Sequence, residues 1–358
     1  MSNFIEYKGK TAFHPGYYLK EIIEESGLTQ EDYALRLGTT PKNLSILLRG
    51  EQSLSIDIAV KLSRMLGGSI EYWLNLQKAF DEKKGEILSE KELEKEKEIF
   101  NYIDYNYFRS NFGFPEFPRL IEEKIKFLRE FLNISSLTLL LNRELTVKFR
   151  SYADKLSNSN IVNANVMVQI ATNEALKKCH TKFNMKSFNK AIDKALALTF
   201  EHKDFLNKIQ NYFEESGVIV IALPYLKNSG INGAVKKIGS KILLMINDRR
   251  GYADTLWFTL FHEIGHVINR DYGISVENET EEDADLFARN KLIPDEKYKS
   301  YLEQNKKFTI KSIKEFAASI NRDPGIVLGR LLYDKKIPYS EERSFTELRH
   351  KYKITNCS

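Results

Sequence analysis

The sequence has 358 residues, of which 42% are hydrophobic, and 54 Lys and Arg against 49 Asp and Glu give a formal net charge of +5. This length allows two or three domains with ample core, and the mild basic excess permits nucleic-acid binding without arguing for it. No apolar run reaches the length of a membrane span and the N-terminus lacks a signal-peptide core, so we expect a cytoplasmic protein with no membrane partner. The two cysteines, Cys179 and Cys357, lack C-x-x-C spacing, which argues against a cysteine zinc site.

The first 80 residues carry the start and stop signals of five short helices. Gly27 ends the first, Thr29 is a good N-cap for the second, and Thr40 followed by Pro41 starts the third, which runs to Gly50. Apolar periodicity predicts two further helices that would complete a bundle. The last four predicted helices cover residues 30–37, 41–49, 56–66 and 70–80.

Two short helices joined by the turn at residues 38–40 form a helix-turn-helix pattern. In such a pair the second helix enters the major groove, where Asn suits adenine, Arg suits guanine and Lys can take phosphate instead. The alternative is an all-helical bundle whose polar face is only solvated. The candidate DNA contacts are Thr40, Lys42, Asn43, Ser45 and Arg49.

Five phrases between residues 13 and 80 stand out: Phe13-His14-Pro15-Gly16, Gly27-Leu28-Thr29-Gln30, Leu37-Gly38-Thr39-Thr40, Leu47-Leu48-Arg49-Gly50 and Ser69-Ile70-Glu71-Tyr72-Trp73-Leu74-Asn75-Leu76-Gln77. This segment resembles the HigA-type, XRE-class antitoxin repressors. The resemblance implies a homodimer that binds double-stranded operator DNA, usually in its own promoter, and that often neutralises a partner toxin. Free-standing antitoxins of this kind usually stop near Ala79, whereas this chain continues.

Beyond that segment, residues 82–98 form a mixed-charge run that is typical of a solvated helix or a linker, and we expect a domain boundary there. Helices are predicted over residues 120–131, 136–156, 162–179 and 187–199. The aromatic residues between 100 and 117 are scattered, which favours packing over a base-stacking platform. His180 and His202 stand alone in the sequence, and lone histidines are usually structural or surface residues.

At Gly217 the pattern changes to short β-branched runs. Residues 218–223 and 240–247 are predicted strands, with residues 230–239 turning between them. An exposed edge of such a sheet could pair with an extended peptide substrate.

Residues 261–266 read Phe-His-Glu-Ile-Gly-His, the H-E-x-x-H arrangement. Apolar residues recur at helical spacing around it, so His262 and His266 would lie one turn apart on one helical face, where both imidazoles can reach a single Zn²⁺. Glu263 would then lie beside the metal, placed to act on a bound water. The alternative is a degenerate site that still folds but no longer catalyses a reaction.

A catalytic zinc site needs a third protein ligand and an open water position. Residues 280–288 supply carboxylates on a second amphipathic stretch, where we favour Glu281 as the ligand while Glu277, Glu279 and Glu282 stay open. Asp285 lies four residues after Glu281 and could accept a hydrogen bond from the far nitrogen of a ligand histidine, which would fix its tautomer. The sequence leaves open which residue donates the hydrogen bond that would stabilise an oxyanion, and Arg289 is one possibility.

A second set of phrases covers about residues 205–340: Gly217-Val218-Ile219-Val220, Trp257-Phe258-Thr259-Leu260-Phe261-His262-Glu263-Ile264-Gly265-His266, Glu281-Glu282-Asp283-Ala284-Asp285-Leu286-Phe287-Ala288 and Ile293-Pro294. They resemble the ImmA/IrrE family of zinc metallopeptidases, whose members relieve repression by cutting a helix-turn-helix repressor. The resemblance implies zinc ligation by His262, His266 and Glu281, with Glu263 as general base. The common family phrase has Glu where this chain has Asp283.

We therefore expect a mainly α protein with an N-terminal all-α helix-turn-helix bundle, a helical middle region and a C-terminal α+β zincin-like metallopeptidase domain. The expected boundaries are residues 1–82, 83–204, 205–340 and a tail at 341–358. Three functional hypotheses follow. The first is a DNA-binding regulator whose zinc peptidase cleaves itself or a partner regulator, the second an antitoxin-like repressor whose peptidase fold only senses or binds, and the third an interaction scaffold.

Overall fold

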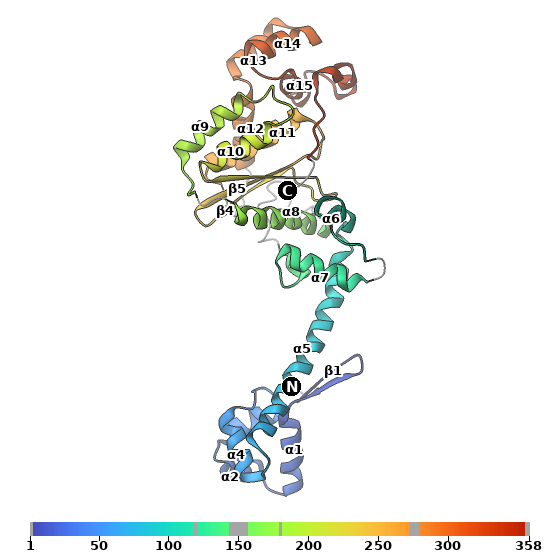
Figure 1. Ribbon diagram of the computed structural model, residues 1–358, viewed down its shortest axis with the longest axis vertical. Coiled ribbons are helices and arrows are strands. Elements are labelled where there is room, and N and C mark those ends of the chain that lie inside the picture. Colours follow the sequence, from blue (N-terminus) through green and yellow to red (C-terminus); the bar gives the residue numbers. More distant parts are fainter. Residues whose placement is uncertain (1–2, 118–119, 143–156, 179–180, 272–278, 355–358) are drawn as a thin grey trace. The chain divides into compact units, whose positions relative to one another are not determined.

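A computed structural model describes residues 3–117, 120–142, 157–178, 181–271 and 279–354, with the side chains of α12 described from Glu282 onward. Cys179, Cys357, His180 and Glu277 lie outside these residues. The chain is mainly α-helical, with a helix-turn-helix region at its N-terminus and a small mixed sheet in its C-terminal part, which confirms the predicted fold class. It divides into two compact units, residues 1–95 and 96–358 (Figure 1).

The helices of the N-terminal unit begin and end close to the predicted residues. They are α1 (Pro15–Ser26), α2 (Gln30–Leu37), α3 (Pro41–Leu48), α4 (Ile56–Leu66) and α5 (Ile70–Phe100). The predicted caps form, because the side chain of Thr29 accepts from Asp32 N and that of Thr40 accepts from Asn43 N. The predicted end of the fifth helix near residue 80 is wrong. It continues through the mixed-charge run, where pairs such as Lys83–Glu86 support an exposed helix.

A hairpin precedes these helices that the sequence reasoning missed. Strands β1 (Phe4–Tyr7) and β2 (Lys10–Phe13) pair antiparallel around Lys8 and Gly9, which both have positive φ, as tight hairpin turns require. Ala12 packs with Phe80 and Ile87 of α5. The run is too short and too polar for period-two alternation to reveal it.

Several residues of the sequence motifs between positions 13 and 80 make contacts that hold this unit together. His14 caps α1, its buried Nδ1 accepting from Gly16 N at 3.0 Å. A Cβ on Gly16 would lie 2.2 Å from Leu47 O, so only glycine lets α1 approach α3 this closely. The Oε1 atom of Gln77 accepts from Leu54 N at 2.8 Å, which ties α5 to the loop before α4. These contacts fix α3 within the bundle.

The C-terminal unit contains α6 (Tyr105–Phe112), α7 (Ile121–Leu132), η1 (Leu137–Leu141), α8 (Asn158–Lys177), α9 (Met185–Leu196), α10 (Phe205–Glu214), β3 (Val218–Leu223), β4 (Gly233–Ile238), β5 (Lys241–Asn247), α11 (Ala253–Ile268), α12 (Glu279–Leu292), α13 (Asp295–Gln304), α14 (Ile310–Ser319), α15 (Pro324–Tyr333) and η3 (Tyr339–Leu348). Of the helix predicted over 136–156, only the 3₁₀ turn η1 lies within the described residues. The aromatic residues near position 105 pack as predicted, since Tyr105, Tyr107 and Phe108 are buried.

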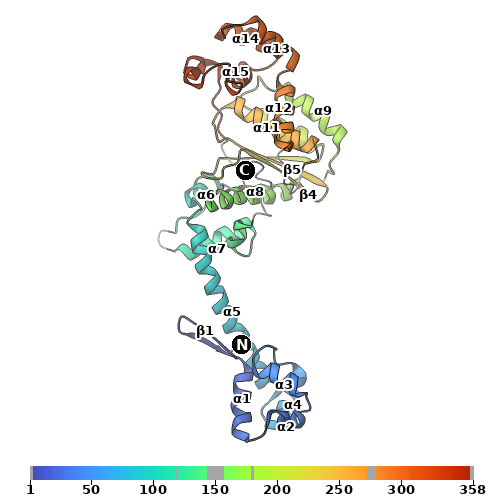
Figure 2. The same cartoon turned by 180° about the vertical axis from the view of Figure 1, so that it is seen from behind.

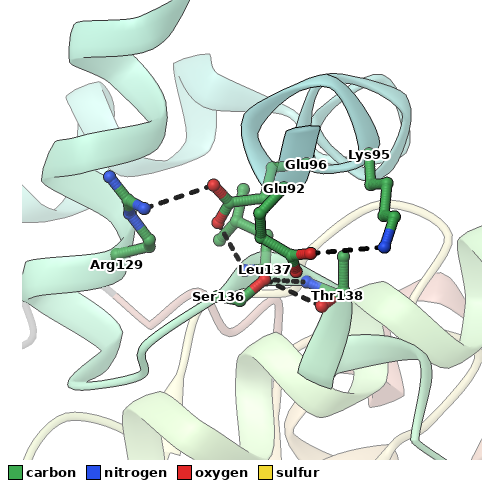
Figure 3. A network of polar contacts seen from close by, with 7 residues as sticks. All are labelled: Glu92, Lys95, Glu96, Arg129, Ser136, Leu137 and Thr138. Carbon is green, nitrogen blue, oxygen red and sulfur yellow. Dashed lines mark hydrogen bonds and ion pairs between the residues drawn. The ribbon is translucent and has the colours of Figure 1, made fainter. Parts of the chain in front are cut away.

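The last turn of α5 is tied into this unit by a buried carboxylate. Glu96 is fully buried, lies 3.2 Å from Arg129 Nη1 of α7 and accepts from Leu137 N at 2.8 Å (Figure 3). A buried carboxylate is tolerated only when it is paired and hydrogen-bonded in this way. Glu96 therefore joins α5, α7 and η1 at the start of the unit.

The sheet has the order β3-β5-β4, with β3 parallel and β4 antiparallel to β5. Residues 233–238, predicted as part of a turn, form strand β4. Gly230 and Gly239 confine the turning to its two ends through positive φ, and Ala234 and Val235 are buried. Helix α8 covers one face of the sheet, and α10 and α11 cover the other (Figures 1 and 2).

Helix α11 lies at the centre of this core. Trp257, Phe261 and Ile264 are almost fully buried there, as their helical spacing predicts. Phe345 and Leu348, beyond the predicted domain end, are buried in the same core. Among the described residues, no helix is long and apolar enough to cross a membrane.

Candidate metal centre and nucleic-acid interface

Helix α11 brings His262, Glu263 and His266 together as their spacing predicts. The Nε2 atoms of the two histidines lie 3.0 Å apart, and the side chain of His266 is only 1% exposed against 21% for His262. The two imidazoles therefore converge on one point at the edge of a buried helix.

A carboxylate lies beside the far nitrogen of each imidazole. His262 Nδ1 donates to Asp285 Oδ1 at 2.7 Å, so Asp285 stands where the sequence placed it. His266 Nδ1 lies 3.3 Å from Asp271 Oδ2, and this buried aspartate was missed by the sequence reasoning. The sequence gives little indication of Asp271, because the position of this residue depends on the turn that follows α11. Arg270 adopts positive φ, and Asp271 N donates back to His266 O at 2.8 Å.

This arrangement fits a metal ion. With Nδ1 protonated toward a carboxylate, each Nε2 presents a lone pair, and two lone pairs 3.0 Å apart repel unless a proton or a metal ion lies between them. In a tetrahedral site with Zn–N distances of about 2.0–2.1 Å, ligand nitrogens are separated by about 3.3 Å. The two histidines, oriented by aspartates, thus match the donor set that zinc takes.

Helix α12 lies very close to the motif. A Cβ on Gly265 would lie 2.9 Å from Ala284 Cα, so glycine at this position lets the two helices approach. Glu281 lies in α12, one turn before Asp285, and its side chain is outside the described part of the structure. The same holds for Glu279, whereas Glu282 is described and exposed.

Glu263 is 6% exposed and lies against strand β4. A Cβ on Gly233 would lie 2.6 Å from Glu263 Oε1, so the missing side chain of this glycine makes room for the carboxylate. The strand that the sequence did not predict therefore contributes directly to the site.

Two further polar side chains lie beside Asp285. Arg289 Nε donates to Asp285 O at 3.2 Å, and its guanidinium lies 5.9 Å from the centre of the Tyr333 ring. Partial burial, and then the negative charge of Asp285, raise the pKa of Tyr333. Tyr333 was missed because α15 follows the motif by some 60 residues and only the fold returns it to this place.

The DNA-contact candidates lie on and around α3. Lys42 and Asn43 are exposed, Ser45 is half-buried, and Thr40 is the N-cap, so its hydroxyl is already engaged by the Asn43 backbone. Leu44 and Leu47, between them, are buried in the bundle. One face of α3 is thus polar and accessible.

Arg49 is held within the protein. Its Nε and Nη2 donate to the two carboxylate oxygens of Glu51 at 3.0 and 2.9 Å, and Nη1 donates to Ser45 Oγ at 2.5 Å. The hydrogen bonds to Glu51 raise the pKa of Arg49. To contact a base, this arginine must first leave Glu51.

Comparison with known proteins agrees with the N-terminal geometry. Residues 19–73 match the family described as helix-turn-helix. Virulence-associated protein I of Dichelobacter nodosus is 34% identical over 76 residues, which cover 21% of this chain and 70% of that protein. The HTH-type transcriptional regulator YddM of Escherichia coli K12 is 36% identical over 73 residues, which cover 20% of this chain and 78% of that protein.

Antitoxin HigA-1 of Vibrio cholerae is 36% identical over 61 residues, which cover 17% of this chain and 57% of that protein. A crystal structure of a protein described as an antidote of a plasmid maintenance system, from Nostoc punctiforme, shares 27% identity. The matched region covers 24% of this chain and 92% of the chain in that crystal structure, with a TM-score of 0.23.

Proposed function

The N-terminal segment of this chain belongs to the helix-turn-helix family of DNA-binding regulators, and we propose that the chain joins this regulator to a zinc-dependent endopeptidase. Cleavage of the chain itself or of a partner regulator would relieve repression at an operator bound by a homodimer. The observation that carries the peptidase proposal is the convergence of His262 and His266 Nε2, with both Nδ1 atoms facing carboxylates.

His262, His266 and Glu281 would hold the ion, with Asp285 and Asp271 orienting the imidazoles. When bound, Zn²⁺ supplies a Lewis acid that polarises the scissile carbonyl and lowers the pKa of the attacking water. Glu263 takes the proton from that water and passes it to the leaving amine. Its burial against Gly233 keeps the carboxylate in one place, which general-base catalysis requires.

A donor must also stabilise the oxyanion. Arg289 and Tyr333 are the candidates, because both lie beside Asp285. Strand β4, next to Glu263 and paired on one side to β5, could align an extended peptide.

The test begins with the zinc content of the purified chain and of its His266→Ala variant. Loss of one equivalent of zinc in the variant supports the site, and equal zinc contents in the two proteins overturn the peptidase proposal. Glu263→Gln should then keep the zinc and abolish cleavage, both of the chain itself and of an unstructured protein substrate. Glu303→Gln, an exposed glutamate of α13, is the matched control and should cleave normally.

The likeness to antitoxin HigA-1 favours a second candidate, an antitoxin-like repressor whose peptidase fold is a non-catalytic sensing or binding module. It expects a partner toxin and operator binding that does not depend on zinc. A reporter fused to the chain's own promoter separates the two. The peptidase proposal expects derepression by the wild-type chain but not by Glu263→Gln, whereas the alternative expects the two proteins to behave alike.

A further inference from the structure

Three residues far apart in the sequence meet at a second point of the C-terminal unit. His202 precedes α10, Asp323 is the N-cap of α15, and His350 follows η3. One nitrogen of each imidazole and one oxygen of Asp323 lie within 4.8 Å of one another. His202 stands alone in the sequence, but the fold brings it together with two other potential metal ligands.

The geometry of this cluster differs from that of a hydrogen-bonded group. The Nε2 atoms of His202 and His350 lie 3.4 and 3.8 Å from the same atom, Asp323 Oδ2, which is long for a hydrogen bond. The two rings stack with centroids 3.6 Å apart and planes at 25°. The two N–O separations are close to the spacing of about 3.3 Å between the ligands of a tetrahedral zinc ion. Stacked rings do not direct both Nε2 lone pairs at one point, so the imidazoles must turn apart to share an ion.

The surroundings favour a cation. Asp323 is 5% exposed, and its other oxygen, Oδ1, is fixed by a hydrogen bond of 2.7 Å from Gly325 N, so Oδ2 is held in place. Two neighbouring arginines are directed elsewhere, since Arg322 donates to Leu292 O and Asn321 O, and Arg349 is bound to Asp254. The buried Nδ1 of His202 has no hydrogen-bond partner among the described residues.

We propose that His202, Asp323 and His350 form a second divalent metal site of the zinc class, separate from His262 and His266. Two imidazoles and a carboxylate are a zinc donor set. The ion would attach the segment 339–354 to the starts of α10 and α15. That segment already joins α11, because Ala253 N donates to His350 O at 2.9 Å and Arg349 pairs with Asp254 at 2.7 Å. An ion held there, with water in the position that the three residues leave open, would hold the C-terminal segment beside α11.

Zinc stoichiometry of the full chain tests this proposal after stripping with a chelator and titration with Zn²⁺. We expect one equivalent to disappear in the double variant His202→Ala/His350→Ala. One equivalent should remain in His262→Ala/His266→Ala, and none in the fourfold variant. If His202→Ala/His350→Ala binds as much zinc as the wild type, the second site does not exist. A different result is expected if the peptidase site binds no zinc. In that case His262→Ala/His266→Ala binds as much zinc as the wild type.

A second measurement covers the case in which the double variant does not fold. In the His262→Ala/His266→Ala background, Zn²⁺ should raise the Tm, and His350→Gln should remove that rise. His350 is 46% exposed, so its replacement leaves the core intact. Asp323→Asn keeps an N-cap but loses the charge, and should weaken zinc binding at least tenfold. A Tm rise that survives both substitutions overturns the proposal.

Discussion

The carboxylate of Glu263 lies where the side chain of Gly233 would otherwise be, since a single carbon added there would come within 2.6 Å of Oε1. Gly233→Ala should therefore displace the carboxylate without touching either histidine. We expect zinc content to stay at the wild-type value and cleavage to fall at least tenfold. Cleavage assays and metal analysis on the same preparation check this.

The control for that experiment is Lys237→Ala, an exposed position on the same strand. It should cleave normally. If Gly233→Ala cleaves as fast as the wild type, Glu263 does not act from the position described.

Asp285 should set zinc affinity through His262 rather than by contact with the ion. Its Oδ1 accepts from His262 Nδ1 at 2.7 Å, and loss of such a partner typically lowers metal affinity about 10- to 100-fold. Asp285→Ala should show this loss in competition with a chromophoric chelator. Asp283→Ala, exposed on the same helix, should bind zinc like the wild type, and equal affinities for the two variants would exclude the orienting role.

Glu51 should weaken DNA binding by holding Arg49. Removing it frees the guanidinium, and because exposed ion pairs are weak we expect the affinity to rise about two- to fivefold. The probe is duplex DNA enriched from a random pool by the wild-type chain. Glu25→Ala makes the same charge change at an exposed position of α1. If Glu51→Ala gains no more affinity than Glu25→Ala, or if Arg49→Ala binds like the wild type, Arg49 is not a contact.

The N-terminal unit should lose stability as the pH falls from about 7 to 5. Burial lowers the pKa of His14 below the ordinary value of 6.5, opposed in part by the nearby charge of Asp81. In that pH range the unfolded chain binds a proton that the folded chain does not, so the stabilising contribution present at higher pH is lost. His14→Asn keeps a residue able to cap α1 but cannot titrate, and should show a smaller loss.

Urea unfolding at both pH values measures this effect. In a Trp257→Phe background, Trp73 is the one remaining tryptophan and reports on the N-terminal unit alone. Identical pH dependence with and without His14 would contradict the prediction.

Local signals were enough to predict much of this protein. Thr29 and Thr40 cap their helices as expected, because capping depends on residues only three positions apart. The same locality places His262 and His266 on one face of α11, since helical spacing alone determines that relation. Asp285 was reachable because it lies on the next helix, facing the motif.

What the sequence alone determined is therefore the helix-turn-helix segment, the mainly helical class and the histidine pair. The tertiary structure alone decided that residues 233–238 form a strand against Glu263, and that His202, Asp323 and His350 meet. The physical reason is the distance along the chain over which each kind of interaction acts. Caps and periodicity act within one or two turns, whereas the approach of Gly233 to Glu263 and the meeting of the three distant residues depend on how whole elements pack.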